Sequence, residues 1–159
     1  MEVPSRILDP AKQARLLTAL YIAQEQDGYL TPDSLKRVAK RLDLPEAEVY
    51  GTASFYTLFR TEPVGRYVIQ VCTGLSCYLA GGAERLVEYL ERKLEINVGE
   101  TTSDGLFTLQ TVQCLAACGN APAMRVNDEL YDDLTIEKID MLIDQLRERA
   151  ERWMSLRQS

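Results

Sequence analysis

Histidine is absent from this sequence of 159 residues. The chain therefore lacks the side chain that most often serves as a general base near neutral pH and as a nitrogen ligand for metals. A Ser-His-Asp or Cys-His catalytic site is excluded within the chain, and so is a Rieske-type cluster, which needs two histidine ligands. Any metal that this chain binds alone must be held by thiolates, carboxylates or backbone oxygens.

Long apolar runs are also missing, because no stretch approaches the roughly 18 residues that a membrane-spanning helix requires. Residues 1–15 show no apolar segment between a basic start and a small-residue cleavage site, which a secretory signal would contain. Acidic residues outnumber basic ones: 24 Asp and Glu against 18 Lys and Arg give a net charge of −6, whereas binding to a phosphate backbone needs clustered lysine and arginine. These absences predict a cytoplasmic protein that does not bind nucleic acid. If the protein meets a membrane, we expect it to do so through a partner protein.

The first half of the chain, residues 1–64, is predicted to be an N-terminal helical domain. Apolar residues recur there at helical spacing after each of three start signals. Each start signal contains a proline near the first helical position: Asp9-Pro10, Thr31-Pro32 and Pro45. The third helix carries the aromatic residues Tyr50, Phe55 and Tyr56, with Phe59 just beyond it. We expect these aromatics to pack in a core, with a docking face for a partner protein as the alternative.

The second half, residues 65–159, has the pattern of an α/β layer fold. Short β-branched or alternating runs predict the strands Tyr67–Val71, Leu106–Val112, Ala123–Val126 and Glu129–Tyr131. Amphipathic spacing predicts the helix Glu84–Leu94 and a last helix that begins after Thr135. The charged tail after Arg147 is expected to fray.

All four cysteines lie in the second half, as two pairs: Cys72 with Cys77, and Cys114 with Cys118. The spacings are C-x4-C and C-x3-C, and each pair follows the end of a predicted strand. If these strands are parallel neighbours, both pairs meet at one edge of the sheet. A [2Fe–2S] cluster takes four protein ligands, so the four cysteines satisfy it with none left over.

Other roles for the cysteines fit the same pattern less well. Structural disulfides are disfavoured without a secretory signal, and a thioredoxin-type dithiol is disfavoured because no CxxC occurs. Four buried structural cysteines are a third alternative. A structural zinc site with four cysteine ligands is the strongest rival, although zinc usually takes shorter CxxC spacings. The spacing favours an iron–sulfur cluster over zinc without excluding zinc.

Several segments together resemble a known family. They are residues 23–30, 49–56, 71–77 (VCTGLSC), 99–109 (GETTSDGLFTL) and 114–122 (CLAACGNAP). In this order they are similar to thioredoxin-like [2Fe–2S] ferredoxins and, more narrowly, to the E subunits of bacterial NADH–quinone oxidoreductase (respiratory complex I). The resemblance extends over about residues 15–146. Two places depart from the family pattern: residues 78–82 (YLAGG) stand where the family often has a basic residue shortly after the second cysteine, and Ala116 stands where it often has glycine.

The resemblance implies that Cys72, Cys77, Cys114 and Cys118 all ligate one [2Fe–2S] cluster. It also implies a thioredoxin-like second domain behind a helical first domain, and a partner flavoprotein subunit that binds NADH and FMN. The chain itself has no G-x-G-x-x-G motif, and Gly81-Gly82 is interpreted as the start of a helix. We therefore expect an electron-carrying subunit without a complete active site. Equivalent subunits of NAD-linked hydrogenases or formate dehydrogenases are not separated by these motifs.

Residues 35–59 have the outline of a helix-turn-helix, which raises DNA binding as a second class of function. The second helix of such a motif reads DNA through side-chain donors near its start. Here that position carries Glu46 and Glu48, and no lysine or arginine lies between Glu46 and Arg60. DNA binding is therefore disfavoured.

Overall fold

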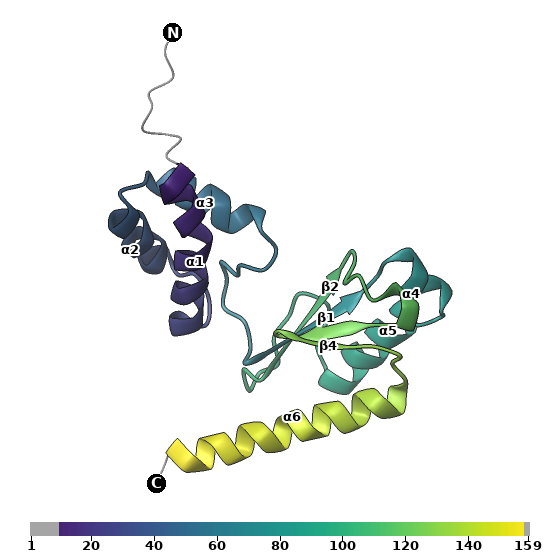
Figure 1. Cartoon of the computed structure of the whole chain (residues 1–159). Helices are drawn as coiled ribbons and strands as arrows, with labels where there is room; N and C mark the ends of the chain where they lie inside the picture. The colour runs from purple at the N-terminus through teal and green to yellow at the C-terminus, as the bar shows by residue number, and fades with distance from the viewer. Residues whose placement is uncertain (1–9, 158–159) are drawn as a thin grey trace. The chain divides into compact units, whose positions relative to one another are not determined.

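The computed structural model describes residues 10–157 and separates the chain into two compact units, Met1–Val64 and Gly65–Ser159 (Figure 1). Within residues 10–64, the first unit contains three helices: α1 (Pro10–Asp27), α2 (Pro32–Leu42) and α3 (Glu46–Phe55). Their apolar stripes meet in one core because residues three and four apart lie on one helix face. Core residues from the three helices include Leu16, Leu20, Leu35, Val38, Val49 and Ala53.

Two polar side chains of the first unit form hydrogen bonds with backbone groups. The hydroxyl of Thr31 caps α2 by accepting the N–H of Ser34 at 3.0 Å, which is the expected role of threonine at an N-cap. The buried side chain of Gln24 donates to the carbonyl of Leu58 at 3.1 Å and accepts the N–H of Arg60 at 2.7 Å. Gln24 thereby fixes the segment that follows α3 against α1.

The aromatic residues of the third helix correct one prediction. Phe59 is buried, but Phe55 is 77% exposed and Tyr50 is 57% exposed, so they do not fill a core. Phe55 and Tyr56 contact each other edge to face, with ring centroids 5.1 Å apart. Val49 and Ala53 occupy the buried face of α3. The rings of Tyr50, Phe55 and Tyr56 therefore lie outside that face and are exposed.

The second unit contains a four-stranded sheet in the order β2-β1-β3-β4. The strands are β1 (Tyr67–Cys72), β2 (Phe107–Val112), β3 (Met124–Val126) and β4 (Glu129–Tyr131). β1 pairs with β2 in parallel and with β3 antiparallel, and β3 pairs antiparallel with β4. The parallel pair requires a crossover, which the short helix α4 (Leu75–Leu79) and α5 (Ala83–Leu94) provide.

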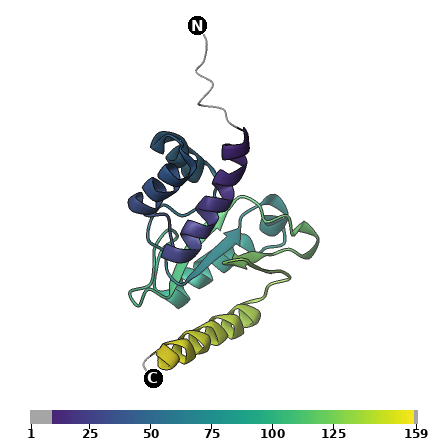
Figure 2. The same cartoon turned by 60° about the vertical axis from the view of Figure 1, so that its left-hand side comes forward.

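One face of this sheet carries the main core. Alternating residues such as Ile69, Phe107 and Met124 pack against apolar residues of α5 and of α6 (Ile136–Arg157). Period-two alternation places these side chains on the same face. α6 is the long helix below the sheet in both views (Figures 1 and 2). The predicted architecture, a helical first part followed by an α/β layer, is confirmed.

The length of α6 corrects the expectation of fraying after Arg147, because the helix continues to Arg157. Ala150 is 1% exposed, and the guanidinium of Arg66 lies 4.2 Å from the centre of the Trp153 ring. Such a cation–π contact contributes about 0.5–1 kcal/mol at an exposed site. The last turns are thus tied to the residue that precedes β1. None of the helices within residues 10–157 is long and apolar enough to cross a membrane.

A polar contact joins α5 to α6. The carboxylate of Asp140 accepts hydrogen bonds from Lys93 at 2.5 Å and from the Tyr89 hydroxyl. The hydrogen bond from Lys93, followed by that from Tyr89, lowers the pKa of Asp140 below its ordinary value. A depressed carboxyl pKa adds stability that is present above the unfolded-state pKa of about 3.9 and is lost as the pH falls through the folded-state value.

The Asp140→Asn variant is therefore expected to be less stable than the wild type near neutral pH, and the difference should shrink below about pH 4. At the alkaline end, the hydrogen bond to Asp140 raises the pKa of Lys93, so the difference should also fall as the lysine loses its proton. Chemical denaturation of both proteins from acidic to alkaline pH measures this difference in the free energy of unfolding. Asp144→Asn is the control, because Asp144 lies 3.9 Å from Lys93 and is 66% exposed. Equal pH profiles for the two variants would contradict the assignment.

Candidate metal centre

The predicted convergence of the two cysteine pairs has its structural basis in the parallel strands. β1 and β2 run in register, with Cys72 opposite Val112, so both strands end at the same edge of the sheet. The N–H and hydroxyl of Thr73 donate to the carbonyl of Val112 at 2.9 and 3.1 Å. These bonds tie the loop after β1 to the loop after β2, which contains Cys114 and Cys118.

Each pair combines one residue near a strand end with one on a short helical turn. Cys77 lies in α4, whose N-cap is Gly74, and Cys118 begins the 3₁₀ turn η2 (Cys118–Asn120). The carbonyl of Ala123 accepts the N–H of Cys72 at 3.0 Å, and Ala123 belongs to the same buried cluster as Cys72 and Cys77. Ala123 therefore packs beside both cysteines of the first pair.

The two pairs differ in exposure. Cys72 and Cys77 are 3% and 2% exposed, within a small cluster completed by Ala83 and Ala123. Cys114 and Cys118 are exposed, and all four thiols are free. The site thus has a buried inner side and an outer side that faces the surface of the second unit.

The sulfur of Cys72 is the centre of the hydrogen-bond network. Burial raises the pKa of its thiol, but N–H donors from Gly74 and Leu115, together with the thiols of Cys77 and Cys114, outweigh burial and lower it overall. Burial, the hydrogen bond to Cys72, and repulsion from Cys72 and Cys118 raise the pKa of Cys77, although the Ala123 N–H opposes them. All four cysteines therefore interact electrostatically at one place.

This donor set fits a [2Fe–2S] cluster. Within residues 10–157, no group of three or more cysteine or carboxylate side chains is arranged to hold a single metal ion. A [2Fe–2S] cluster takes four protein ligands, two on each iron, and thiolate is also the donor of a four-cysteine zinc site. The four free thiols supply the number and the kind of donor that the cluster needs.

The turn at Ala116 explains one departure from the family pattern. Ala116 has φ +59°, a left-handed conformation that costs a residue with a Cβ roughly 1–2 kcal/mol and that glycine adopts freely. In this conformation its N–H donates to the sulfur of Cys114 at 3.3 Å. The backbone shape is thus kept where glycine is replaced by alanine.

Gly74 sets the spacing between the two loops. A Cβ at this position would lie 2.9 Å from the carbonyl oxygen of Gln113 and 3.5 Å from the sulfur of Cys72. We expect Gly74→Ala to separate the loops and to reduce the iron retained per chain by about tenfold, as loss of groups that support metal ligands commonly does. Iron analysis after gel filtration measures this loss. Gly119→Ala is the matched control beside Cys118, because nothing lies within 4 Å of the added Cβ; equal iron loss in both variants would refute the steric explanation.

Two features of the site are not visible as sequence patterns. A Cβ on Gly82 would lie 2.2 Å from Cβ of Pro122, so the start of α5 lies directly against the segment after Cys118. Three apolar side chains of α4, on either side of Cys77, are exposed: Leu75 at 73%, Tyr78 at 54% and Leu79 at 74%. The interpretation of Gly81-Gly82 as a helix start agrees with Gly82 as the N-cap of α5.

Comparison with known proteins shows the family to which the chain belongs. Residues 6–147 match the thioredoxin-like [2Fe–2S] ferredoxin family, and the chain belongs to that family. An E subunit of the NADH-quinone oxidoreductase of Rhizobium meliloti is 44% identical over 147 residues, covering 92% of this chain and 86% of the relative. The E subunit of the NADH-quinone oxidoreductase of Rickettsia felis is 42% identical over 135 residues, covering 84% and 80%.

Among solved structures, the air-oxidized NAD⁺-reducing [NiFe]-hydrogenase is similar with a TM-score of 0.75 and 29% identity. The likeness covers 85% of this chain but 23% of that hydrogenase chain. The H₂-reduced state of the hydrogenase gives a TM-score of 0.71 at 27% identity. The predicted family and the predicted thioredoxin-like fold are therefore confirmed.

Proposed function

We propose that this chain is the electron-carrying subunit of an NADH–quinone oxidoreductase and holds one [2Fe–2S] cluster through its four cysteines, Cys72, Cys77, Cys114 and Cys118. The observation that carries the proposal is the parallel pairing of β1 with β2, because each cysteine pair begins at or just after the end of one of these strands. Family membership supports the cluster, and the similarity to E subunits of this oxidoreductase supports the complex.

The bound cluster would supply storage of a single electron at a time. The protein would position the cysteine sulfurs and set the polarity of their surroundings. Backbone hydrogen bonds from Gly74 and Leu115 help to lower the pKa of Cys72, and one from Ala123 opposes the rise in the pKa of Cys77. Hydrogen bonds to sulfur favour the more negative, reduced state of a cluster. The burial of these two thiols keeps water from the inner side, while exposed Cys114 and Cys118 leave the outer side accessible to a redox partner.

The partner is proposed to be a flavoprotein subunit that binds NADH and FMN and exchanges single electrons with this chain. Exposed apolar residues suit a protein interface of this kind, since aromatic side chains are enriched there. The exposed apolar residues include Leu75, Tyr78 and Leu79 beside Cys77, and Tyr50, Phe55 and Tyr56 on the first unit. The chain would carry electrons without a catalytic site of its own and would be a cytoplasmic subunit, peripheral to the membrane through its complex.

The likeness to an NAD⁺-reducing [NiFe]-hydrogenase supports one second candidate, the equivalent subunit of an NAD-linked hydrogenase. The site would do the same work in either complex, because only the electron source or acceptor beyond the flavoprotein differs. Electron flow in the purified complex separates the two. NADH-dependent quinone reduction supports the oxidoreductase, whereas H₂-dependent NAD⁺ reduction supports the hydrogenase.

A reduction experiment tests the proposed electron transfer. The chain is mixed with NADH under anaerobic conditions, with or without its FMN-containing partner, and the EPR signal of the reduced cluster is followed. We expect the signal to develop rapidly only when the flavoprotein is present. Rapid reduction by NADH alone, or no reduction with the partner present and dithionite effective, would contradict the proposal.

A positive charge near the site gives a further prediction. The guanidinium of Arg125 donates to the side-chain oxygen of Gln70 through Nε at 3.0 Å and Nη2 at 2.6 Å. Gln70 and Cys72 lie two residues apart on β1 and therefore on the same face of the sheet. Arg125 should favour the more negative reduced state, so Arg125→Gln is expected to lower the midpoint potential.

We expect this shift to be on the order of tens of millivolts, because a screened charge contributes ~1 kcal/mol and 59 mV corresponds to a tenfold change for one electron. EPR-monitored redox titration measures it. The control is Arg92→Gln, which removes the same charge from the last turn of α5. An unchanged potential in the Arg125 variant would rule out electrostatic tuning by this residue.

A further inference from the structure

A groove runs between α1 and α2 of the first unit. Its volume is about 800 Å³, and its lining comes from one stripe of each helix. The α1 stripe is mostly small: Ala11, Ala14, Thr18, Ala19 and Ala23 line the groove together with Ile22, which is 51% exposed. Val38 and Leu42 of α2 complete an apolar lining. Small residues on one helix leave room there for side chains of another segment.

The charged residues that line this groove are all arginines: Arg15, Arg37 and Arg41. No aspartate or glutamate is among the lining residues, although the chain as a whole has a net charge of −6. Within residues 10–157, the ion pairs include one made by Arg37 and none made by Arg15 or Arg41. The groove therefore has a positive rim with two guanidinium groups available for external carboxylates.

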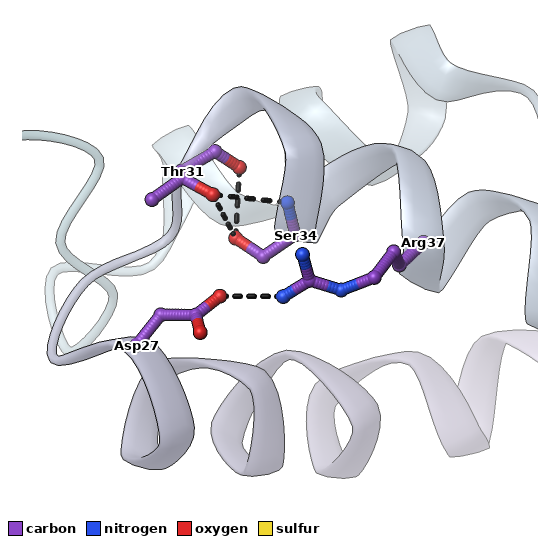
Figure 3. Close-up of polar contacts among 4 residues, drawn as sticks. All are labelled: Asp27, Thr31, Ser34 and Arg37. Carbon is purple, nitrogen blue, oxygen red and sulfur yellow. Dashed lines mark hydrogen bonds and ion pairs between the residues drawn. The ribbon is translucent and has the colours of Figure 1, made fainter.

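An ion pair joins α1 to α2 near each end of the groove. Asp27 near the end of α1 pairs with Arg37 at 2.5 Å, beside the Thr31–Ser34 cap of α2 (Figure 3). At the opposite end, Lys12 pairs with Asp43 at 2.8 Å. These contacts hold α1 and α2 at a fixed separation. A groove formed in advance lowers the ordering cost of binding.

We propose that this groove binds an acidic amphipathic helix of the partner subunit. The inference rests on the proposed function, because it assumes that a protein partner exists. An amphipathic helix places apolar side chains at i, i+3, i+4 and i+7 into a groove, which suits the alanine-lined wall. Its flanking carboxylates would pair with Arg15 and Arg41. Nucleic acid fits less well, since its binding requires extended clusters of basic residues.

Charge reversal in a reconstituted complex tests the proposal. The double variant Arg15→Glu/Arg41→Glu is compared with Lys36→Glu/Lys40→Glu, which makes the same charge change on exposed positions of α2 outside the groove. We measure the affinity of each full chain for the purified flavoprotein. The arginine variant is expected to bind at least about tenfold more weakly, as loss of close charge pairs at interfaces does, and the lysine variant to bind within about threefold of wild type.

Failure of the proposed function can be distinguished from failure of the groove as the docking site. If the wild-type chain does not bind the flavoprotein at all, the proposed function fails and this inference fails with it. If the wild type binds and both double variants weaken binding equally, the groove is not the docking site and the proposed function stands.

Photocrosslinking identifies the occupant. A photoreactive benzoylphenylalanine in place of Thr18, an exposed residue of the groove, is irradiated in the assembled complex, and the crosslinked peptide is sequenced. We expect a partner segment with apolar residues at helical spacing and flanking glutamate or aspartate. A crosslink to the second unit of the same chain, to a second copy, or to a basic segment would overturn the proposal, as would the absence of any crosslink in an intact complex.

Discussion

The Cys114→Ser variant is expected to lose nearly all of its iron and sulfide while its apoprotein stays folded. Cys114 is exposed, so the substitution removes little packing, and exposed substitutions usually change the free energy of unfolding by less than about 0.5 kcal/mol. As one of four ligands, however, it should be needed for retention of the cluster. We expect a fall of at least about tenfold in bound iron, because loss of a supporting residue alone costs about 10–100-fold.

Iron and acid-labile sulfide analysis, together with thermal unfolding of the apoprotein, measures both halves of this expectation. Gln113→Ser is the matched control, since it introduces the same residue at the preceding exposed position. Full iron and sulfide content in the Cys114→Ser variant would remove Cys114 from the ligand set. A large loss of apoprotein stability would instead favour a structural role for this cysteine.

Gly82→Ala is expected to destabilise the second unit strongly. The added Cβ would lie 2.2 Å from Cβ and 2.3 Å from Cγ of Pro122, and real side chains do not approach so closely. Because Gly82 is buried and lies at the start of α5, either α5 or the Pro122 segment must move. Overpacking of this kind costs about 1–3 kcal/mol, and the displaced segment continues into Ala123, which contacts Cys72 and Cys77.

Chemical denaturation of the apoprotein measures this loss, and iron content measures its effect on the site. The double variant Gly82→Ala/Pro122→Gly removes both clashing atoms. Its destabilisation should therefore be smaller than the sum of the two single changes, since contacting residues are not additive. A Gly82→Ala protein as stable as the wild type, or strict additivity in the double variant, would contradict the close packing of α5 on Pro122.

The order of elements and the edge of the sheet that carries the cysteines were predictable from sequence. Buried strands leave local signals, such as the run that ends at Cys72, and a strand–helix–strand order requires a parallel crossover. The parallel pairing of β1 with β2 then brings Cys114 to the same edge. Motif order and residue spacing were sufficient to predict the order of the elements and the location of the cysteines, because each strand or helix signal lies within a few residues of sequence.

Long-range contacts were not predictable in the same way. Nothing near Gly82 in the sequence indicates that Pro122 lies against it, since that contact depends on tertiary packing. The helix α4 was missed because five residues are too few to show helical periodicity. The last turns of α6 were expected to fray because they are charged, whereas Ala150 is buried and Trp153 stacks on Arg66.

The exposed aromatics show a different limit. Tyr50, Phe55 and Tyr56 were expected in a core because aromatic residues usually bury large surfaces. Burial is decided by helix phase, and Val49 and Ala53 take the core side of α3. Hydrophobicity alone does not distinguish a core residue from one at an interface, so the sequence left a core and a docking face as alternatives for these aromatics, and their exposure decided against the core.

The most direct test of the central claim is the composition of the natively loaded protein, determined by iron, zinc and acid-labile sulfide analysis with EPR after dithionite reduction. Four thiols that share one [2Fe–2S] cluster predict two irons, two sulfides and a single S = 1/2 signal per chain. Stoichiometric zinc without sulfide would contradict that account and would make the cysteine site a structural zinc centre.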